Sequence, residues 1–251
     1  MRSFHPLPAD DMSKSISQFR FKQFAVWHHR SALKVGVDGV LVGAWADVGE
    51  AGSILDVGTG CGVIALMMAQ RKPDAEILGI DIDEPSIQEA TENVSISPWP
   101  DRVSILRASF SDLNSKFDLI VSNPPFFDSG ISAPDTPRER ARHQASLSPA
   151  TLLSGSLHLL NPGGSLAMIV PADHVSDLET YAASLGYTLS RKCLVRGTPT
   201  APIKRALLQW TLNNSQSASH NFQSENLTLE SAPGIPTPEY RDLCCPFYLK
   251  F

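Results

Sequence analysis

Residues 54–66 read ILDVGTGCGVIAL, and this stretch decides the fold. An apolar run, Ser53–Val57, ends in three closely spaced glycines, after which Val63–Arg71 has the composition of a helix. Glycines at a strand-to-helix turn let the backbone approach a ligand closely, and the helix N-terminus offers free N–H groups. The stretch therefore predicts a buried strand, a ligand-binding turn and a helix.

Further apolar runs follow at regular intervals along the chain. They cover residues 76–80, 117–121 and 165–170, and residues 85–96 between the first two have a helical composition. Strands that alternate with helices predict an α/β fold with a parallel sheet covered on both faces. After residue 186, runs at 189–195 and 206–212 predict an antiparallel finish. Residues 213–226 are polar and predict a loop, and residues 238–245 predict a short helix.

Composition limits the class of protein. The chain has 251 residues, 42% of them apolar, and 21 basic against 26 acidic residues give a net charge of −5. We expect one domain over residues 1–251: an N-terminal extension (1–50), a core (51–212) and a C-terminal loop and tail (213–251). No apolar run approaches the roughly 20 residues of a membrane span, and no secretory signal is seen, so we expect a cytoplasmic protein with no membrane partner.

Charge and cysteines narrow the choice of partners. A negative net charge argues against a non-specific DNA binder, although a local basic patch can still hold RNA. The four cysteines form no CxxC pair, so we expect no metal; they are Cys61, Cys193, Cys244 and Cys245.

The glycine turn favours S-adenosyl-L-methionine over a dinucleotide. Its spacing is GxGxG (Gly58, Gly60, Gly62) rather than GxGxxG, and Asp56 stands two residues before the first glycine. Asp81 follows about twenty residues later, where a carboxylate can accept hydrogen bonds from both hydroxyls of an adenosine ribose. We therefore predict that these five residues hold S-adenosyl-L-methionine.

Three more residues are candidates for the adenine end of the cofactor. Ile82 can pack on the adenine face, although it can equally be a core residue. Ser109 and Phe110 are expected to close a further strand between the runs at 76–80 and 117–121, where such sites line the adenine. A serine stands there in place of the more usual acidic residue.

The sequence SNPPFF (residues 122–127) follows the apolar run at 117–121 and carries the expected chemistry. The side-chain oxygen of Asn123 and the carbonyl of Pro124 can accept hydrogen bonds from a conjugated NH₂ group, which frees the nitrogen lone pair for attack on a methyl group. Pro124 and Pro125 lack N–H groups and stiffen the loop. Phe126 can stack on a planar group, which is worth ~1–3 kcal/mol for a base. Alone, NPPF could simply be a turn that ends a strand.

A basic cluster lies soon after this loop. It can bind RNA phosphate, or it can be a solvated face paired with Glu139; its members are Arg138, Arg140, Arg142 and His143. Basic residues around the late strands can extend it, and they are Arg191, Lys192, Arg196, Lys204 and Arg205.

Taken together, the motifs resemble those of the class I amino-methyltransferases, and the whole chain is similar to the bacterial valine-tRNA adenine N6-methyltransferases. The more specific stretches are KQF and LKVGVDGVLVGAW within residues 19–46, RERARHQASL (138–147) and PEYRDLCCPFYL (238–249). The resemblance implies a Rossmann-like, mostly parallel seven-stranded sheet with an antiparallel last strand. It implies methyl transfer to N6 of the adenine 3′ of the anticodon in a valine tRNA. It also places Asp38 near the amino-acid end of the cofactor, although the VGVDG segment that contains Asp38 can equally be a helix cap.

Other targets remain open at this point. One alternative is a methyltransferase that acts on a glutamine of release factors, because the glutamine side-chain amide presents the same NH₂ geometry. The family of such enzymes carries a helical domain before the core. A guanine N2-methyltransferase for rRNA is a second alternative, often with a duplicated domain. From another class, an RNA chaperone that binds the cofactor without turnover is disfavoured by Asn123, Pro124 and Phe126.

Overall fold

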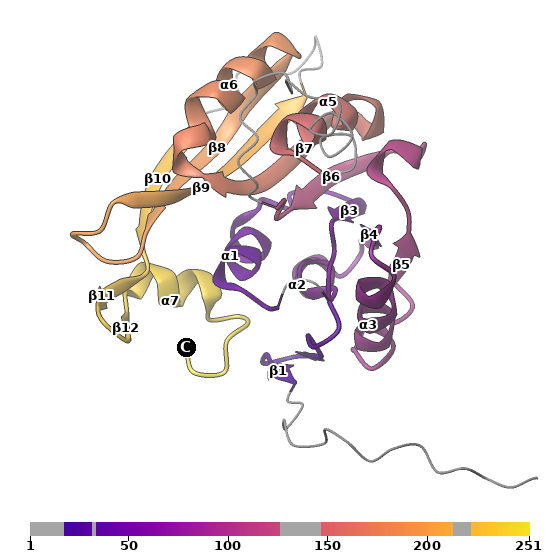
Figure 1. Cartoon of the computed structure of the whole chain (residues 1–251), viewed down its shortest axis with the longest axis horizontal. Coiled ribbons are helices and arrows are strands. Elements are labelled where there is room, and N and C mark those ends of the chain that lie inside the picture. Colours follow the sequence, from indigo (N-terminus) through magenta and orange to yellow (C-terminus); the bar gives the residue numbers. More distant parts are fainter. Residues whose placement is uncertain (1–17, 32–33, 126–146, 213–221) are drawn as a thin grey trace, which may run out of the picture.

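The computed structural model describes residues 18–31, 34–125, 147–212 and 222–251. A central eight-stranded sheet runs in the order β10-β8-β9-β7-β6-β3-β4-β5 (Figure 1). Its strands are β3 (Ser53–Val57), β4 (Glu76–Asp81), β5 (Val103–Arg107), β6 (Phe117–Ser122), β7 (Leu160–Pro171), β8 (Tyr187–Arg196), β9 (Ile203–Leu212) and β10 (Gln223–Thr228). The short strands β1 (Phe19–Arg20), β2 (Ala25–Val26), β11 (Glu230–Ala232) and β12 (Ile235–Pro236) form two small ribbons.

The helices follow the strands in the expected alternation. The α-helices are α1 (Val37–Trp45), α2 (Val63–Arg71), α3 (Glu84–Ser95), α5 (Pro149–Leu159), α6 (Val175–Ser184) and α7 (Pro238–Cys244). Two 3₁₀ turns, η1 (Phe110–Asp112) and η2 (Ala172–His174), complete the described elements. No helix in the described ranges is long and apolar enough to span a membrane.

The sheet has the predicted character and one strand more than expected. Strands β5, β4, β3, β6 and β7 are parallel, and β9 is antiparallel to both β7 and β8. The eighth strand, β10, pairs parallel to β8 at the edge. The predicted loop over 213–226 is therefore wrong for residues 223–226, while 213–221 lie outside the described residues. β10 reads QSENLT and is mostly exposed, so backbone pairing rather than an apolar pattern defines it.

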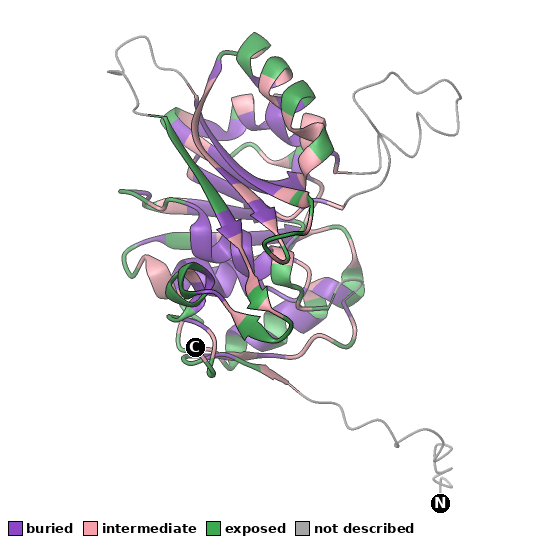
Figure 2. Cartoon of the chain, turned by 90° about the vertical axis from the view of Figure 1, so that its left-hand side faces the viewer, coloured by how far each residue is buried: buried purple, intermediate pink, exposed green. Residues whose placement is uncertain are grey.

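Two clusters of buried side chains cover the two faces of the sheet. Ile54, Val121 and Leu207 pack with α1 and α2 on one face. Leu55, Ile120 and Leu208 pack with α5 and α6 on the other (Figure 1). Figure 2 shows this burial through the sheet, with exposed residues on its outer helices. Successive residues of a strand point to opposite faces, so one apolar run supplies both clusters.

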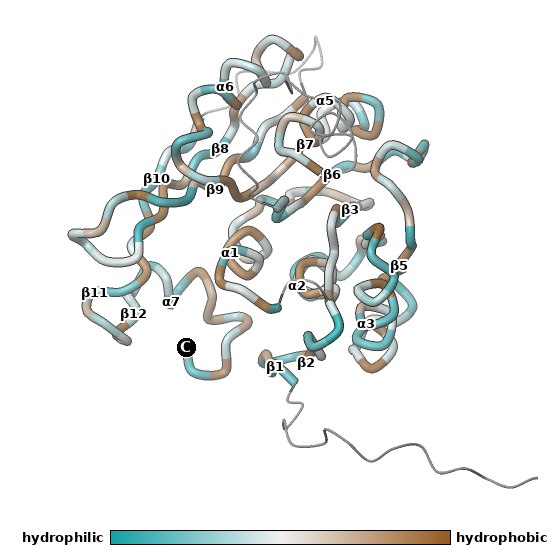
Figure 3. The backbone as a smooth tube through the Cα atoms, in the orientation of Figure 1, coloured by the Kyte–Doolittle hydropathy of each residue, from teal (hydrophilic) through white to brown (hydrophobic). Residues whose placement is uncertain are grey.

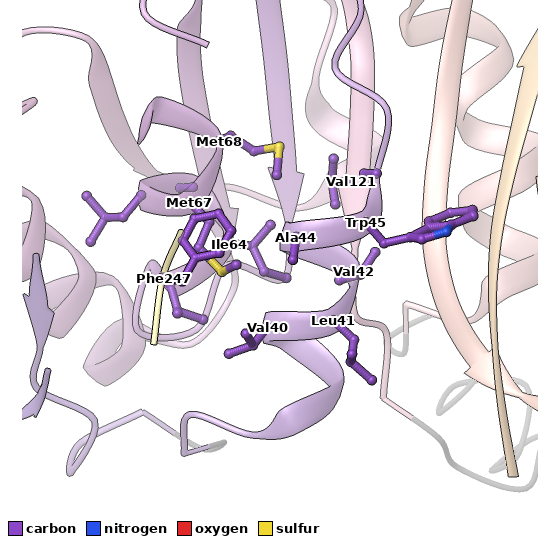
Figure 4. Close-up of a cluster of buried hydrophobic side chains, with 14 of the residues drawn as sticks. Val40, Leu41, Val42, Ala44, Trp45, Ile64, Met67, Met68, Val121 and Phe247 are labelled. Carbon is purple, nitrogen blue, oxygen red and sulfur yellow. The ribbon is translucent and has the colours of Figure 1, made fainter. Parts of the chain in front are cut away.

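Helix α1 is buried on nearly all sides because it lies between the sheet and the C-terminal segment. A Cβ atom at Gly43 would lie 2.8 Å from the Sδ atom of Met67, so glycine permits the close crossing of α1 and α2. Trp45 of α1, Met67 of α2 and Phe247 belong to the same cluster (Figure 4). By contrast, much of α3 is hydrophilic (Figure 3).

The N-terminal and C-terminal segments meet on the outside of this helical layer (Figure 1). Phe21 forms an antiparallel bridge with Tyr248, and the Lys22 N–H donates to the Phe247 carbonyl at 2.8 Å. The ring centroids of Phe21 and Tyr248 lie 6.0 Å apart in stacked geometry. Residues more than 220 positions apart in the sequence therefore hold each other in place.

Candidate active site

The glycine turn joins β3 to α2 at the carboxyl end of the sheet. Gly58, Gly60 and Gly62 have φ angles of 72°, 53° and 84°, which lie in the left-handed region that favours glycine. The N–H groups of Gly58 and Thr59 both donate to the Ile80 carbonyl at 2.9 Å. The turn is therefore fixed against the end of β4.

Asp81 at the end of β4 lies beside this turn. Its Oδ2 accepts the Gly60 N–H at 3.0 Å, and its Oδ1 accepts the Asp83 N–H at 3.0 Å. Each oxygen has a second lone pair for a further donor. The neighbouring Ile82 side chain is 58% exposed. A rigid carboxylate next to an exposed apolar side chain fits the ribose and adenine of S-adenosyl-L-methionine.

Asp56 lies beneath the turn and is fully buried. Its Oδ2 accepts the Thr59 hydroxyl at 2.6 Å and the Ala65 N–H at 3.0 Å. Its Oδ1 is buried and makes no hydrogen bond with any described residue. Burial raises the pKa of Asp56 to about 7, against the effect of these two hydrogen bonds.

This raised pKa predicts how stability depends on pH. Between its unfolded pKa, near 4, and about 7, Asp56 holds a proton in the folded state that it loses on unfolding, so its contribution to stability falls as pH rises. The Asp56→Asn variant mimics the neutral form and lacks this fall. Relative to wild type, we expect it to gain about 3 kcal/mol of unfolding free energy between pH 5 and pH 8. Urea unfolding of both proteins at the two pH values measures the difference; parallel pH profiles would contradict it.

Asn123 follows β6 and faces the same end of the sheet. The Ser122 hydroxyl donates to the Val57 carbonyl at 2.8 Å, which ties the end of β6 to the end of β3. The Asn123 Oδ1 atom is buried and has no hydrogen-bond partner among the described residues. Such an atom carries a desolvation cost that a ligand donor can remove. Pro124 is buried and Pro125 is half-buried, while Phe126 lies outside the described residues.

Helix α1 brings Asp38 to this site. A Cβ atom at Gly39 would lie 3.8 Å from the Asn123 Nδ2 atom, so the first turn of α1 adjoins the NPP sequence. Asp38 Oδ2 is 2.9 Å from the Arg205 Nε atom. The alternative that the VGVDG segment forms a helix cap is confirmed, because Gly36 is the N-cap of α1 and Asp38 lies in its first turn.

The remaining predicted residues are less closely joined to the site. The Ser109 hydroxyl is 2.9 Å from that of Ser111. The ring of Phe110 is buried against Gly155, so only its backbone is available to a cofactor. The predicted RNA-binding residues Arg138, Arg140, Arg142 and His143 lie outside the described residues.

Two residues of α3, Glu89 and Asn93, were not anticipated from the sequence. The buried Glu89 carboxylate accepts the N–H groups of His29, Arg30 and Ser31 at 2.8–2.9 Å. These bonds lower the pKa of Glu89 although burial opposes them. Successive N–H groups with one carboxylate acceptor leave no pattern in the sequence, because the partners are about 60 residues apart.

Asn93 connects this N-terminal segment to the cofactor turn. Its amide donates to the carbonyls of Trp27 and Cys61 at 2.8 and 2.9 Å, and its oxygen accepts the Trp27 N–H at 2.7 Å. Cys61 belongs to the glycine turn. The segment 27–31 is therefore positioned directly beside the glycine turn.

Comparison with known proteins agrees with this arrangement. Residues 39–184 match the Methyltransferase small domain family. In structure, the chain shares its fold with a predicted O-methyltransferase from Agrobacterium tumefaciens (TM-score 0.63, 17% identity, 84% of this chain and 96% of that one). The described residues contain no group of three or more His, Cys, Asp or Glu that could hold a metal ion.

Curated relatives match almost the whole chain. A tRNA1(Val) (adenine(37)-N6)-methyltransferase from Bacteroides thetaiotaomicron is 43% identical over 92% of this chain and 97% of its own. The protein of that name from Porphyromonas gingivalis W83 is 44% identical over 92% and 94%. The one from Trichodesmium erythraeum is 42% identical over 94% and 99%. The chain therefore belongs to the tRNA1(Val) (adenine(37)-N6)-methyltransferase family and is a methyltransferase that uses S-adenosyl-L-methionine.

Proposed function

We propose that this protein transfers a methyl group to N6 of adenine 37, the base 3′ of the anticodon, in a valine tRNA. The observation that carries the proposal is the Oδ1 atom of Asn123, at the strand end next to the glycine turn, which is buried and has no hydrogen-bond partner in the part of the chain that the structure describes. This oxygen can accept a hydrogen bond from an exocyclic NH₂ group. The names of the relatives supply the particular base and tRNA.

The chemistry follows from the residues around that atom. S-adenosyl-L-methionine supplies an electrophilic methyl group when bound. The Asn123 Oδ1 atom and the Pro124 carbonyl accept the two N–H groups of the target amine, which turns the nitrogen lone pair away from the ring and toward the methyl group. The methylated nitrogen then loses a proton to water, so no strong general base is needed. Phe126 stacks on the base, which must first be turned out of the anticodon loop.

The residues around the glycine turn would hold the cofactor. Gly58, Gly60 and Gly62 would let the backbone approach it, and the Asp81 carboxylate, which accepts the Gly60 N–H, would accept the ribose hydroxyls. The exposed Ile82 side chain would cover the adenine, and Asp38 would lie near the amino-acid end. The cytoplasm, where tRNA is modified in bacteria, is the location that this proposal requires.

The test is methylation of unmodified total tRNA by the purified protein, followed by mass spectrometry of the digested nucleosides. We expect N6-methyladenosine in the valine tRNA. Cofactor binding without any methylated nucleoside would contradict the proposal and favour a glutamine side-chain amide as the target. N2-methylguanosine in rRNA fragments would favour the other alternative.

A further inference from the structure

The hairpin of β8 and β9 ends at the same edge of the sheet as Asn123. Arg205 of β9 pairs with Pro171 at the end of β7, which in turn pairs with β6. Neighbouring strands are ~4.8 Å apart, so β9 lies about 10 Å from β6 across the sheet. The connection between β8 and β9, orange in Figure 1, therefore lies at the same edge of the sheet as the NPP sequence, with β9 two strands away from β6.

Two cations lie at this hairpin end. Lys204 is exposed, and its ammonium makes no ion pair with any described residue. Among the described residues, the Arg196 guanidinium has one long hydrogen bond, 3.5 Å, to the Pro199 carbonyl. Leu194 packs on the α5 and α6 face, and side chains alternate along a strand, so Arg196 lies on that face as well. Lys204 is the extra residue of a β-bulge, because Val195 pairs with Arg205 and Arg196 pairs with Ile203.

The other cations near the late strands have different roles. Arg205 points to the opposite face and pairs with Asp38. Arg191 lies over the Trp45 ring, 4.4 Å from its centroid, and Lys192 pairs with Glu179 at 2.9 Å. Of the five basic residues predicted to extend the basic patch, Arg191, Lys192 and Arg205 therefore contact other residues of the protein. Arg196 and Lys204 are the two that remain for an RNA ligand among these five.

Charge is distributed unevenly along this edge. Asp81, Asp83, Glu84 and Asp112 lie where β4 and β5 end, and Arg107 there pairs with Glu84. At the β8–β9 end, two acids accompany Arg196 and Lys204. Asp173 of η2 is exposed, while the N–H of Glu230 donates to the Gly197 carbonyl and its carboxylate accepts the Gly234 N–H. Hydroxyl groups of a nucleoside suit the carboxylates at the β4–β5 end, and phosphates suit the two cations of the hairpin.

We infer that Arg196 and Lys204 form a docking surface for the phosphodiester backbone of the RNA substrate. The inference rests on the proposed function, since it assigns the side from which that RNA approaches Asn123. It gives an acidic protein a local basic surface next to its catalytic edge. Phosphate contacts position an RNA without reading its sequence, so these residues set affinity and orientation rather than the choice of base.

The test compares two double variants that each remove two positive charges. Arg196→Gln/Lys204→Gln alters the proposed surface. Arg241→Gln/Lys250→Gln is the matched control, since both of its residues are exposed on the C-terminal segment. Binding of valine tRNA is measured from low to moderate salt, together with cofactor affinity and the kinetics of methyl transfer.

We expect the hairpin variant to reduce the slope of log K against log salt by about 1.4–1.8, because each lost phosphate contact contributes about 0.7–0.9. The KM for tRNA rises about ten-fold or more, while kcat and cofactor affinity stay unchanged. The control variant keeps the wild-type slope. Equal slopes for the two variants would overturn the docking surface while leaving the proposed function intact. A hairpin-dependent slope without methylation by the wild type would overturn the proposed function and leave the surface intact.

Discussion

Replacing Asn123 with alanine is expected to slow methyl transfer to tRNA by about 100- to 1000-fold, the usual loss when one group that stabilises a transition state is removed. The Asn123 Oδ1 atom is the buried acceptor at the end of β6, and alanine leaves the target amine conjugated and poorly nucleophilic. Cofactor binding should stay close to wild type, because the glycine turn and Asp81 are unchanged.

Single-turnover methyl transfer and titration calorimetry with cofactor separate these two effects. Asn114→Ala, at an exposed asparagine before β6, is the matched control and should retain full activity. If Asn123→Ala lost less than about five-fold in rate, the acceptor role of Asn123 would be refuted. Equal losses of cofactor binding and rate would instead indicate that the variant had distorted the site.

Replacing Asp81 with alanine is expected to weaken cofactor binding by about 100-fold or more. Each hydrogen bond from a hydroxyl to a carboxylate is worth ~1.5–3 kcal/mol, and two are lost. The Asp81 carboxylate also orders the turn by accepting the Gly60 N–H at 3.0 Å. Because Asp81 does not contact the reacting amine, the rate at saturating cofactor should fall much less than the affinity.

The matched control is Asp101→Ala, at an exposed aspartate in the turn before β5. This variant also removes one negative charge, and its dissociation constant for the cofactor should equal that of the wild type. An unchanged dissociation constant for Asp81→Ala would remove Asp81 from the cofactor site. Measurable NAD binding by the wild type would go further and contradict the choice of cofactor itself.

Much of the sheet could be predicted because its signals are local. An apolar run followed by glycines gives β3 and α2 the bounds that the sequence indicates, and β6 ends just before the two prolines. Helix α1 gives a weaker signal, because VDGVLVGAW is apolar all round and has no polar face. The edge strand β10 gives none, because its backbone pairs with β8 while its side chains face solvent.

Some residues of the candidate site could also be placed from local sequence signals, and others could not. Asp56, Asp81 and Asn123 could be placed from the sequence because each lies at or next to the carboxyl end of a parallel strand, and these ends share one edge. The proposed domain boundaries at residues 50 and 212 stay predictions, as do the roles of Phe126 and of the basic cluster near residue 140.

The sequence by itself determined the α/β class, the cofactor turn and the NPP sequence, since these depend on residue types a few positions apart. Only the tertiary structure decided that Glu89 holds residues 29–31, that Arg205 pairs with Asp38, and that the buried Asn123 oxygen has no partner among the described residues. The physical reason is distance along the chain. A hydrogen bond or ion pair between residues 60 or 167 positions apart leaves no local pattern, because it forms only after packing has brought the two strands or helices together.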